Sequence, residues 1–374
     1  MDVVKRGTVF VGKAGTEFSS ACFPSICALP GGRWLAGFRA SPKKSDARPQ
    51  KVMLTWSDDE GATWSRPIEP FAAPSIGGKP GDFRAAHPTS LGGKRVLAVL
   101  CWVDASNPTL PFFNAETEGL LDTRIFLSVS EDAGLTWCKP WQVDTRPYAD
   151  PTPITGPVKI LRNGEWAVQF ETNKPYYDMS VWHHSSVLMF SRDRGKTWPE
   201  HVKVTCDPEA RFFYWDQRPG VLRDGTVLDV FWTFDRVRAE YLHIHACASK
   251  DNGRRWSELW DTGIPGQPGP PVQLADGRIA MPYMDRTTVP ILKMRTSADG
   301  GRSWPDDTEV ILDDSAGRAQ EGQKSSMQDA WAEMAKYSVG LPYTALLPDR
   351  SVLVLYYAGT HMDHTGIRWV RVRP

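Results

Sequence analysis

The loops between the apolar runs of this 374-residue chain carry acidic, basic and aromatic side chains suited to carbohydrate chemistry. Paired carboxylates can exchange protons with a glycosidic bond, arginines can bind anionic groups, and aromatic rings can pack on the apolar faces of sugars. The residues that combine these chemistries are Arg39, Asp46, Arg84, His87, Glu171, Asp216, Arg218, Tyr283, Arg286, Tyr337 and Tyr343. For them to share one site, the fold must bring loops from distant parts of the chain to one surface.

The overall composition excludes several classes of partner. The 44 Lys and Arg residues balance 44 Asp and Glu residues, which argues against a protein that binds nucleic acid or an anionic membrane surface. No apolar run approaches the roughly 20 residues of a membrane helix. No glycine-rich phosphate loop and no zinc-type cysteine spacing is present, so we expect neither a cofactor nor a metal. The oligomeric state stays open.

The N-terminus and the cysteines point to a cytoplasmic protein. Residues Met1–Gly7 lack the apolar core of a signal peptide. The six cysteines are too scattered for a disulfide scaffold. We therefore expect reduced thiols in the cytoplasm.

A motif of the form Ser-x-Asp-x-Gly-x-x-Trp organises the chain. It occurs five times, at Ser57–Trp64, Ser130–Trp137, Ser191–Trp198, Ser249–Trp256 and Ser297–Trp304. The Ser and Asp oxygens can accept backbone N–H groups, Gly supplies the positive φ of a tight reversal, and Trp buries a ring beneath it. Because each copy follows a strand-like run, the motif predicts a turn from a third strand to a fourth.

A second series of turns predicts six hairpins. These turns lie at Pro30-Gly31-Gly32, Gly92-Gly93-Lys94, Asn163-Gly164, Asp224-Gly225, Asp276-Gly277 and Pro348-Asp349, each between two apolar runs. Together with the five repeats they predict an all-β fold, a six-bladed β-propeller formed by residues 1–374 as a single domain. Residues Gly7–Val11 are expected to supply the outer strand of the last blade. One short helical insertion is expected within 323–336, where Ser326 and Asp329 can form an N-terminal cap.

The predicted topology separates two ends of the molecule. The repeats and the hairpin turns lie on one end, so we interpret the repeated aspartates as structural. The loops of variable length lie on the other end, and there we expect the functional site. All of the polar and aromatic residues named above fall in or beside those loops.

The five repeats are what is called the Asp-box, or BNR repeat, and the chain resembles the sialidase (neuraminidase) superfamily of six-bladed propellers. The resemblance implies an exo-acting hydrolase with an Asp acid/base, a Tyr nucleophile assisted by a Glu, and three carboxylate-binding arginines. The stretch Leu35–Asp46 is similar to the segment that carries the acid/base, which implies that role for Asp46. Pro342–Leu346 is similar to the nucleophile's context, which implies Tyr343, with Tyr337 second. In Trp215-Asp216-Gln217, Asp216 falls where the family places its assisting Glu.

The chain departs from the family at the arginines. The first arginine opens an Arg-Ile-Pro motif, and the corresponding residues here are Cys22-Phe23-Pro24. A thiol cannot form the bidentate charged contact that a carboxylate favours. His243-Ile244-His245 stands where the second arginine is expected, and Arg286 is placed as the third. The terminal sugar therefore need not be sialic acid, and Arg39, Arg84 or Arg218 is expected to compensate.

In the leading hypothesis the chain is a sialidase-like glycosidase that cleaves a terminal sugar from a glycan. Asp46 is the acid/base, and Tyr343, helped by Asp216 or Glu171, is the nucleophile or stabiliser. The substrate-binding residues are Arg39, Arg84, His87, Arg218, Tyr283 and Arg286. The alternatives are an ordinary loop aspartate at position 46 and a packing tyrosine at position 343.

Two other functions stay open. The missing arginines favour a non-catalytic glycan-binding propeller. A polysaccharide lyase acting on uronic acids would use an Arg or His to neutralise the carboxylate and a Tyr or His as base.

Overall fold

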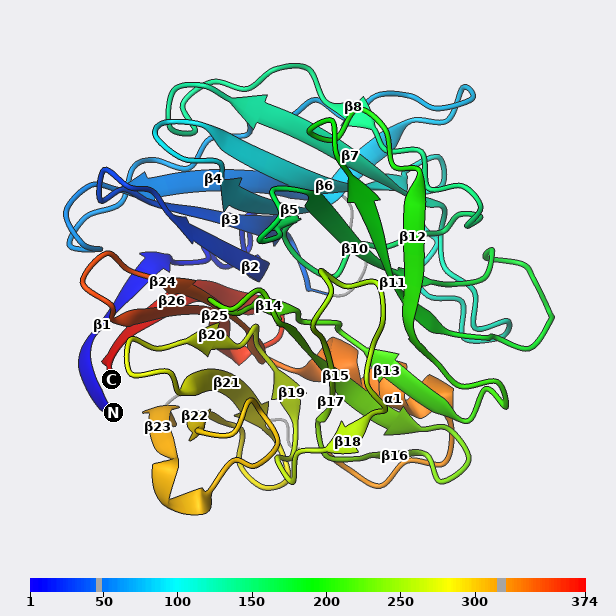
Figure 1. Cartoon of the computed structure of the whole chain (residues 1–374). Helices are drawn as coiled ribbons and strands as arrows, with labels where there is room; N and C mark the ends of the chain where they lie inside the picture. The colour runs from blue at the N-terminus through cyan, green and yellow to red at the C-terminus, as the bar shows by residue number, and fades with distance from the viewer. Residues whose placement is uncertain (45–48, 315–320) are drawn as a thin grey trace.

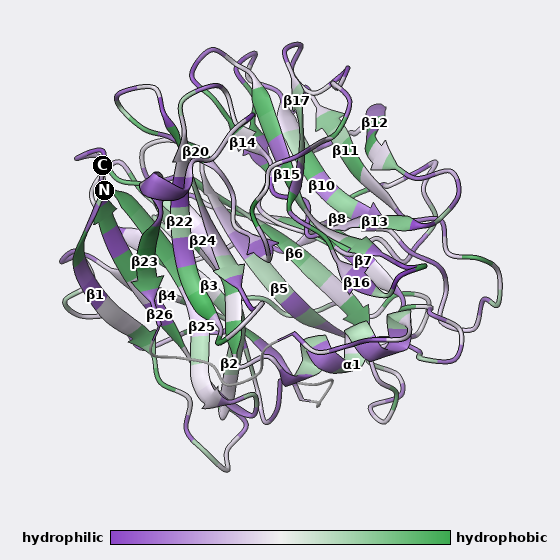
Figure 2. Cartoon of the chain, turned by 90° about the horizontal axis from the view of Figure 1, so that it is seen from below, coloured by the Kyte–Doolittle hydropathy of each residue, from purple (hydrophilic) through white to green (hydrophobic). Residues whose placement is uncertain are grey.

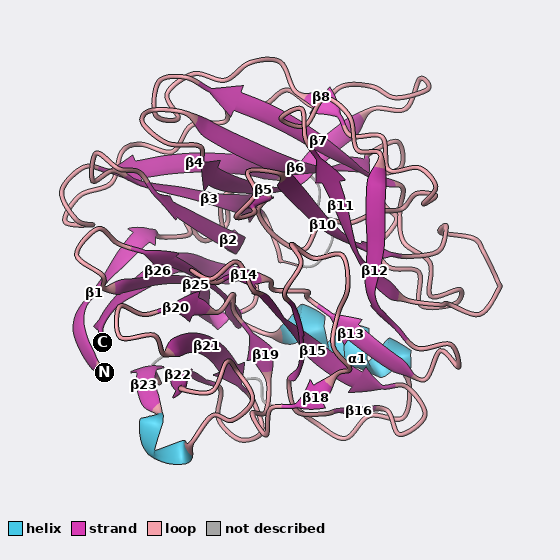
Figure 3. Cartoon of the chain, in the orientation of Figure 1, coloured by secondary structure: helices cyan, strands magenta, loops and turns pink. Residues whose placement is uncertain are grey.

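The chain folds into β-sheets arranged around a common axis like the blades of a propeller (Figures 1 and 3). The computed structural model describes residues 1–44, 49–314 and 321–374. Within these ranges the helical elements are α1 (Met327–Lys336) and the short 3-10 helix η1 (Asp306–Thr308). Neither of these described helices has the length and apolar character needed to span a membrane. The fold is thus all-β, as the turns predicted.

The described strands form five hydrogen-bonded sheets, and the largest has seven strands. Its order is β24 (Val339–Leu346), β25 (Val352–His361), β26 (His364–Arg373), β2 (Ser20–Ala28), β3 (Trp34–Ser41) and β4 (Lys51–Ser57), with β1 (Asp2–Phe10) also paired to β26. Strands β2 and β26 are joined by one parallel pair, Ser20 with Thr365. The antiparallel pairing of β1 with β26 confirms that the N-terminal segment lies beside the last strand of the chain.

The other four sheets follow one another along the chain. The first contains β5 (Gly81–Ser90), β6 (Val96–Asp104), β7 (Thr123–Ser130) and β8 (Trp141–Gln142). The second contains β9 (Lys159–Ile160), β10 (Trp166–Thr172), β11 (Ser185–Ser191) and β12 (Glu200–Cys206). The third contains β13 (Phe212–Trp215), β14 (Gly220–Val221), β15 (Val227–Asp235), β16 (Glu240–Tyr241), β17 (His245–Ser249) and β18 (Trp260–Asp261). The fourth contains β19 (Gln267–Pro268), β20 (Val272–Gln273), β21 (Ile279–Asp285), β22 (Ile291–Ser297) and β23 (Val310–Asp313).

All six predicted hairpins are present. The second series of turns connects β2 to β3, β5 to β6, β9 to β10, β14 to β15, β20 to β21 and β24 to β25. Figure 2 shows that the strands carry most of the hydrophobic residues and the loops most of the hydrophilic ones. The sheets therefore bury their side chains against one another and leave the connecting loops to solvent.

The five repeats fold as hydrogen-bonded turns, and the last of them shows the pattern. The Gly301 N–H donates to Ser297 Oγ over 2.9 Å, and the Ser303 N–H donates to Asp299 Oδ1 over 2.9 Å. Gly301 has a φ of 89°, which glycine adopts without strain. Trp304 donates its indole N–H back to Gly301 O over 3.0 Å. The turn chemistry predicted from the motif is confirmed.

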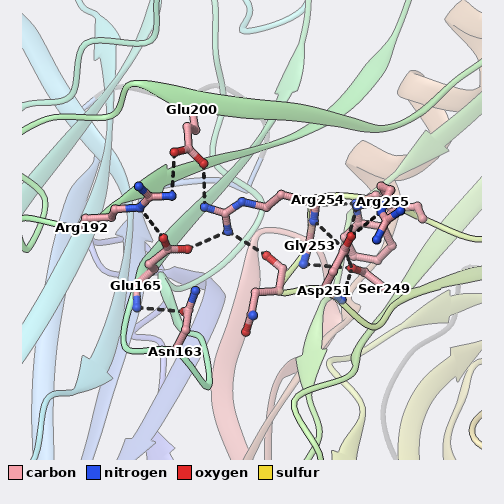
Figure 4. A network of polar contacts seen from close by, with 11 residues as sticks. Asn163, Glu165, Arg192, Glu200, Ser249, Asp251, Gly253, Arg254 and Arg255 are labelled. Atoms are coloured by element: carbon pink, nitrogen blue, oxygen red, sulfur yellow. Dashed lines mark hydrogen bonds and ion pairs between the residues drawn. The ribbon is translucent and has the colours of Figure 1, made fainter.

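A charged network ties the second of these four sheets to the third (Figure 4). Glu165, at the β9–β10 turn, accepts from Arg192 over 2.6 Å and pairs with Arg254 over 2.7 Å. Glu200 on β12 pairs with the same two arginines, at 2.8 Å and 2.9 Å. The Arg254 guanidinium also lies 3.7 Å from the centre of the Phe190 ring. Because the repeat turn that carries Arg254 follows β17, these contacts fix one sheet against the next.

Helix α1 occupies the region where the sequence predicted a helical insertion. Ser326 is its N-cap and accepts the Asp329 N–H over 3.2 Å. Met327 and Ala330 are buried, and Trp331 stacks on Phe113 from the β6–β7 connection, with 4.3 Å between ring centres. The helix is thereby held against the loops at one end of the propeller.

Candidate functional site

A cavity of about 490 Å³ opens between α1 and the loops that the sequence assigned to the functional end. Its lining comes from the first strands of several sheets, from the β6–β7 connection and from α1. None of the described residues that line it belongs to the five repeated turns. The turns and the cavity are therefore separate parts of the molecule.

Bends in the innermost strands aim side chains into this cavity. Phe23, Asp216 and Leu341 line it, and each has a positive φ, of 52°, 53° and 51°. Gly266 has the corresponding bend with a φ of 92° and directs Gln267 into the cavity. A positive φ is strained for residues other than glycine and is retained where the surroundings impose it.

Two carboxylates lie side by side in the cavity wall. Glu171 Oε1 accepts the backbone N–H of Asp216 over 2.6 Å. The other oxygen of Glu171 lies 3.5 Å from Nε2 of His184, which is buried behind it. Asp216 Oδ1 pairs with Arg218 over 3.0 Å, and Asp216 Oδ2 accepts from the side-chain amide of Gln267. The two acids are thus fixed in place by an ion pair with Arg218 and by contacts with a backbone N–H, the Gln267 amide and His184.

Tyr343 lies against Arg218 on the same side of the cavity. The Arg218 guanidinium is 5.0 Å from the ring centre, and the Tyr343 hydroxyl donates to the Thr155 carbonyl over 2.6 Å. Arg218 donates to that same carbonyl. Burial raises the pKa of Tyr343 to about 12, so the phenol is neutral in this arrangement.

His87 packs beside this pair as a neutral base. Its ring centre is 5.2 Å from that of Tyr343. Burial, together with the positive charges of Arg218 and Lys159, lowers the pKa of His87 to about 3. His87 therefore carries no charge at neutral pH and contributes no cation to the site.

Arg286 is a buried cation with unused hydrogen-bonding capacity. Its Nη2 donates to Gln267 over 3.0 Å and to the Val339 carbonyl over 2.9 Å, and its guanidinium lies 4.0 Å from the centre of the Tyr337 ring. Its Nε and Nη1 have no hydrogen-bond partner within the described parts of the chain. Because unpaired buried donors are costly, a ligand oxygen or water placed at these nitrogens would be stabilised.

Lys44 is a further cation that sequence reasoning did not select. Its Nζ donates to the carbonyls of Met334 and Tyr337, both over 2.6 Å, at the C-terminal end of α1. Burial, with additional repulsion from nearby guanidinium groups, lowers the pKa of Lys44 to about 7. Lys44 thus connects the segment that follows β3 to the C-terminal end of α1, across the cavity.

The structure brings most of the predicted residues together. Those that line the cavity are Arg84, His87, Glu171, Asp216, Arg218, Arg286, Tyr337 and Tyr343. Asp46, the predicted acid/base, lies outside the described residues. Arg84 reaches the cavity over the rings of Phe112 and Phe23, at 4.1 Å and 5.1 Å from their centres.

Two predicted substrate-binding residues do not line the cavity. Tyr283 is fully buried within β21, and its hydroxyl donates to Glu309, whose carboxylate also pairs with Arg295. Arg39 is buried beneath Phe23 and donates to Gln50 and to the Lys44 carbonyl. Both side chains bind other parts of the protein, and neither lines this cavity.

Sequence reasoning also missed Gln267 and His184. Gln267 follows a glycine bend at the start of a sheet, the place that Asp216 occupies in the preceding sheet, and this equivalence was the available signal. His184 was visible only as one of two adjacent histidines. Within the described residues, no cluster of three His, Cys, Asp or Glu side chains could hold a metal ion.

Comparison with known proteins places the fold. No protein-family model matches the sequence, and no protein of curated function matches it. A solved protein of unknown function from Dyadobacter fermentans superposes with a TM-score of 0.74 at 19% identity, covering 98% of this chain and 99% of that one.

Solved sialidases superpose as well. A Hadza microbial sialidase does so with a TM-score of 0.66 at 15% identity, covering 98% of this chain and 68% of that one. The intramolecular trans-sialidase from Ruminococcus gnavus does so with a TM-score of 0.62 at 15% identity, covering 98% and 96%. The chain therefore has a sialidase-like fold.

Proposed function

We propose that this chain is a sialidase-like, exo-acting glycoside hydrolase that cleaves a terminal sugar from a glycan. The observation that carries the proposal is the grouping of Glu171 and Asp216 in one cavity with Tyr343 and two arginines. Two carboxylates in one cavity can do acid, base or nucleophilic work on a glycosidic bond. The sialidase-like fold is consistent with a glycan substrate, although a fold alone does not assign a reaction.

We also infer that the propeller has six blades and that its five repeats are Asp-boxes. The seven-stranded sheet is held together at its middle by the single pair of Ser20 and Thr365. Division at that pair gives β2, β3 and β4 as one blade, and β24, β25, β26 and β1 as another. Each of the resulting six units contains one of the six predicted hairpins.

The proposed roles combine the contacts in the cavity with the resemblance of the segment around Asp46. Asp46 is proposed as the acid/base from the resemblance of its segment. Asp216 and Glu171 stabilise or activate the group that attacks the anomeric carbon, and Tyr343 is the proposed nucleophile. For Tyr343 to act, its hydroxyl must exchange the Thr155 carbonyl for a carboxylate that can accept its proton.

The charges favour an acidic sugar. The described lining contains four basic side chains, Lys44, Arg84, Arg218 and Arg286, and two acidic ones, Glu171 and Asp216. Two donor nitrogens of Arg286 have no hydrogen-bond partner among the described residues, whereas Cys22, which stands at the family's first arginine, is a buried thiol. We therefore propose that Arg286 and Arg218 orient the substrate without the family's set of three arginines.

A panel of aryl glycosides that includes sialosides and uronides tests the proposal. Asp216→Asn and Glu171→Gln are each expected to reduce kcat/KM by about 100-fold or more, and Asp46→Asn to do likewise. Glu116→Gln is the matched control, since this exposed carboxylate lies on the β6–β7 connection without lining the cavity. Wild-type activity in all three variants, or no turnover of any glycoside by the wild type, contradicts the assignment.

A non-catalytic glycan-binding protein is the second candidate. The engaged hydroxyl of Tyr343 and its raised pKa favour it, because an activated nucleophile normally has an adjacent base. Glycan-array binding without turnover would identify this function. Release of an unsaturated, ultraviolet-absorbing product would instead identify a lyase.

A further inference from the structure

The cavity has two chemically different sides. One side carries the charged and amide groups described above. The other side, here named the apolar wall, consists of Phe112, Phe113, Leu120, Trp182, Trp215 and Trp331. Five of these six residues are buried members of one hydrophobic cluster, and Trp331 of α1 packs against that cluster. The apolar wall is therefore a continuous packed surface.

The aromatic rings of the apolar wall pack on one another, and one of them, Phe112, also lies 4.1 Å from the Arg84 guanidinium. Phe113 and Trp331 stack with 4.3 Å between ring centres and 3° between planes. Trp215 meets Trp331 edge to face at 6.3 Å and 71°. The indole nitrogens of Trp215 and Trp331 are buried, and they have no hydrogen-bond partner in the described structure. A ligand on this side consequently meets ring carbons, with no donor or acceptor of these two indoles available to it.

A single sugar ring can pack its apolar face on one aromatic ring, but it does not cover the whole apolar wall. Hydroxyl groups placed against it would lose their hydrogen bonds to water without replacement, which costs affinity for each buried group. The cavity volume of about 490 Å³ falls in the range that accommodates drug-sized ligands. The polar side can bind the sugar while the apolar wall covers a second, non-sugar part of the same molecule.

We propose that the apolar wall is a subsite for a flat apolar group carried by the glycoside substrate, with Trp331 as the residue that selects it. The inference rests on the proposed function and names its substrate class, an amphipathic glycoside. The flat group can belong to the aglycone or to an apolar substituent on the sugar, and both would stack on the same rings.

Binding of 4-methylumbelliferone without any sugar tests the subsite separately from catalysis. We expect saturable binding to the wild-type protein by titration calorimetry. Trp331→Ala should weaken that binding about tenfold. Trp331→Leu keeps an apolar, helix-favouring side chain, and its affinity for 4-methylumbelliferone should lie between those of wild type and Trp331→Ala. Trp256→Ala is the matched control, because this partly buried indole lies in a repeat turn that does not line the cavity, and it should bind as wild type does.

Turnover then distinguishes the source of the flat group. If it is the aglycone, Trp331→Ala should lower the ratio of kcat/KM between a methylumbelliferyl glycoside and the methyl glycoside of the same sugar by about tenfold. The better leaving group contributes equally to that ratio in both proteins. If the flat group is a substituent on the sugar, kcat/KM should be higher for glycosides that carry an N-acyl or O-acyl group on the sugar than for those that lack it.

The two proposals fail in different ways. In one outcome, wild type and Trp331→Ala bind 4-methylumbelliferone equally while circular dichroism shows that both are folded. That result overturns the proposed subsite, with or without glycosidase activity. Binding of the probe with loss in Trp331→Ala, but no glycoside turnover, retains the subsite and rejects the hydrolase.

Discussion

Arg218 connects the residues on which the proposed chemistry depends. It pairs with Asp216, lies over the ring of Tyr343 and donates to the same Thr155 carbonyl that accepts the Tyr343 hydroxyl. The carbonyl therefore has two donors, and either can satisfy it alone. This redundancy allows the tyrosine hydroxyl to leave Thr155 without creating an unpaired buried acceptor.

Tyr343→Phe separates a chemical role from a packing role. Because Arg218 continues to satisfy Thr155, the free energy of unfolding should fall by no more than about 1 kcal/mol. If Tyr343 is the nucleophile, kcat should fall by about 100-fold or more on the best glycoside of the panel. Denaturant titration and steady-state kinetics measure the two effects. Unchanged turnover would show that the residue only packs.

His87 predicts how stability depends on pH. Burial lowers its pKa to about 3, against about 6.5 in an unfolded chain. Between these values the unfolded state binds a proton that the folded state does not. The free energy of unfolding should therefore fall as pH falls below 6.5, by at most about 1.4 kcal/mol per pH unit from this group.

His87→Gln should flatten that dependence, measured by urea unfolding from pH 7 to pH 4.5. His201→Gln serves as the control, since this histidine is exposed on β12, and it should follow the wild-type curve. If His87→Gln also follows the wild-type curve, the buried imidazole is not the group responsible.

At the scale of elements, the repeat turns and the cavity should respond independently to mutation. Asp299 accepts N–H groups of Arg302 and Ser303 and the hydroxyls of Ser297 and Ser303. Asp299→Ala removes these bonds, so we expect a loss of about 1–2 kcal/mol in stability. Glycoside turnover and 4-methylumbelliferone binding should not change, because no residue of this turn lines the cavity.

Asp307→Ala is the control for Asp299→Ala. It removes a nearby exposed carboxylate and should leave the midpoint of thermal unfolding unchanged. A loss of turnover in folded Asp299→Ala would contradict the separation of the two ends.

The elements themselves were largely predictable because their signals are local. The turn motif fixes its own hydrogen bonds over eight residues, the hairpin turns identify their flanking strands, and Ser326 marks the start of α1. The side chains that face the cavity depend instead on relations between sheets. Tyr283 was placed in or beside the loops of the functional end, but it lies within β21, which is buried along its whole length.

The same reason explains the residues that were missed. Gln267 enters the cavity because of the bend at Gly266, and Lys44 does so because α1 lies across from it. The first relation is visible only when the starts of two neighbouring sheets are compared, and the second joins residues 290 positions apart in the sequence. The candidate carboxylates and arginines were accessible to prediction because their residue types are uncommon in protein interiors.

At the scale of the whole molecule, the first and last parts of the chain meet around Trp369. This residue of β26 is buried and lies edge to face with Trp34 of β3, at 5.3 Å. On one side it packs on Gly7 of β1, and on the other it packs on Gly61 of the first repeat turn. One indole thus links the N-terminal strand, the C-terminal strand and the neighbouring set of strands. Ring closure prevents the exposed sheet edges that favour aggregation.

Gly7→Val tests how much this closure stabilises the molecule. A Cβ at position 7 would lie 2.6 Å from the Trp369 ring, so the indole or β1 must move. Valine favours strands, and the predicted loss of about 1–3 kcal/mol is therefore steric. Gly31→Val is the matched control, because a Cβ there meets open space without a positive φ. If thermal unfolding gives the same midpoint for both variants, the contact of β1 with Trp369 does not hold the ring closed. If Gly7→Val alone unfolds earlier and self-associates on warming, the open edge of β26 is the cause.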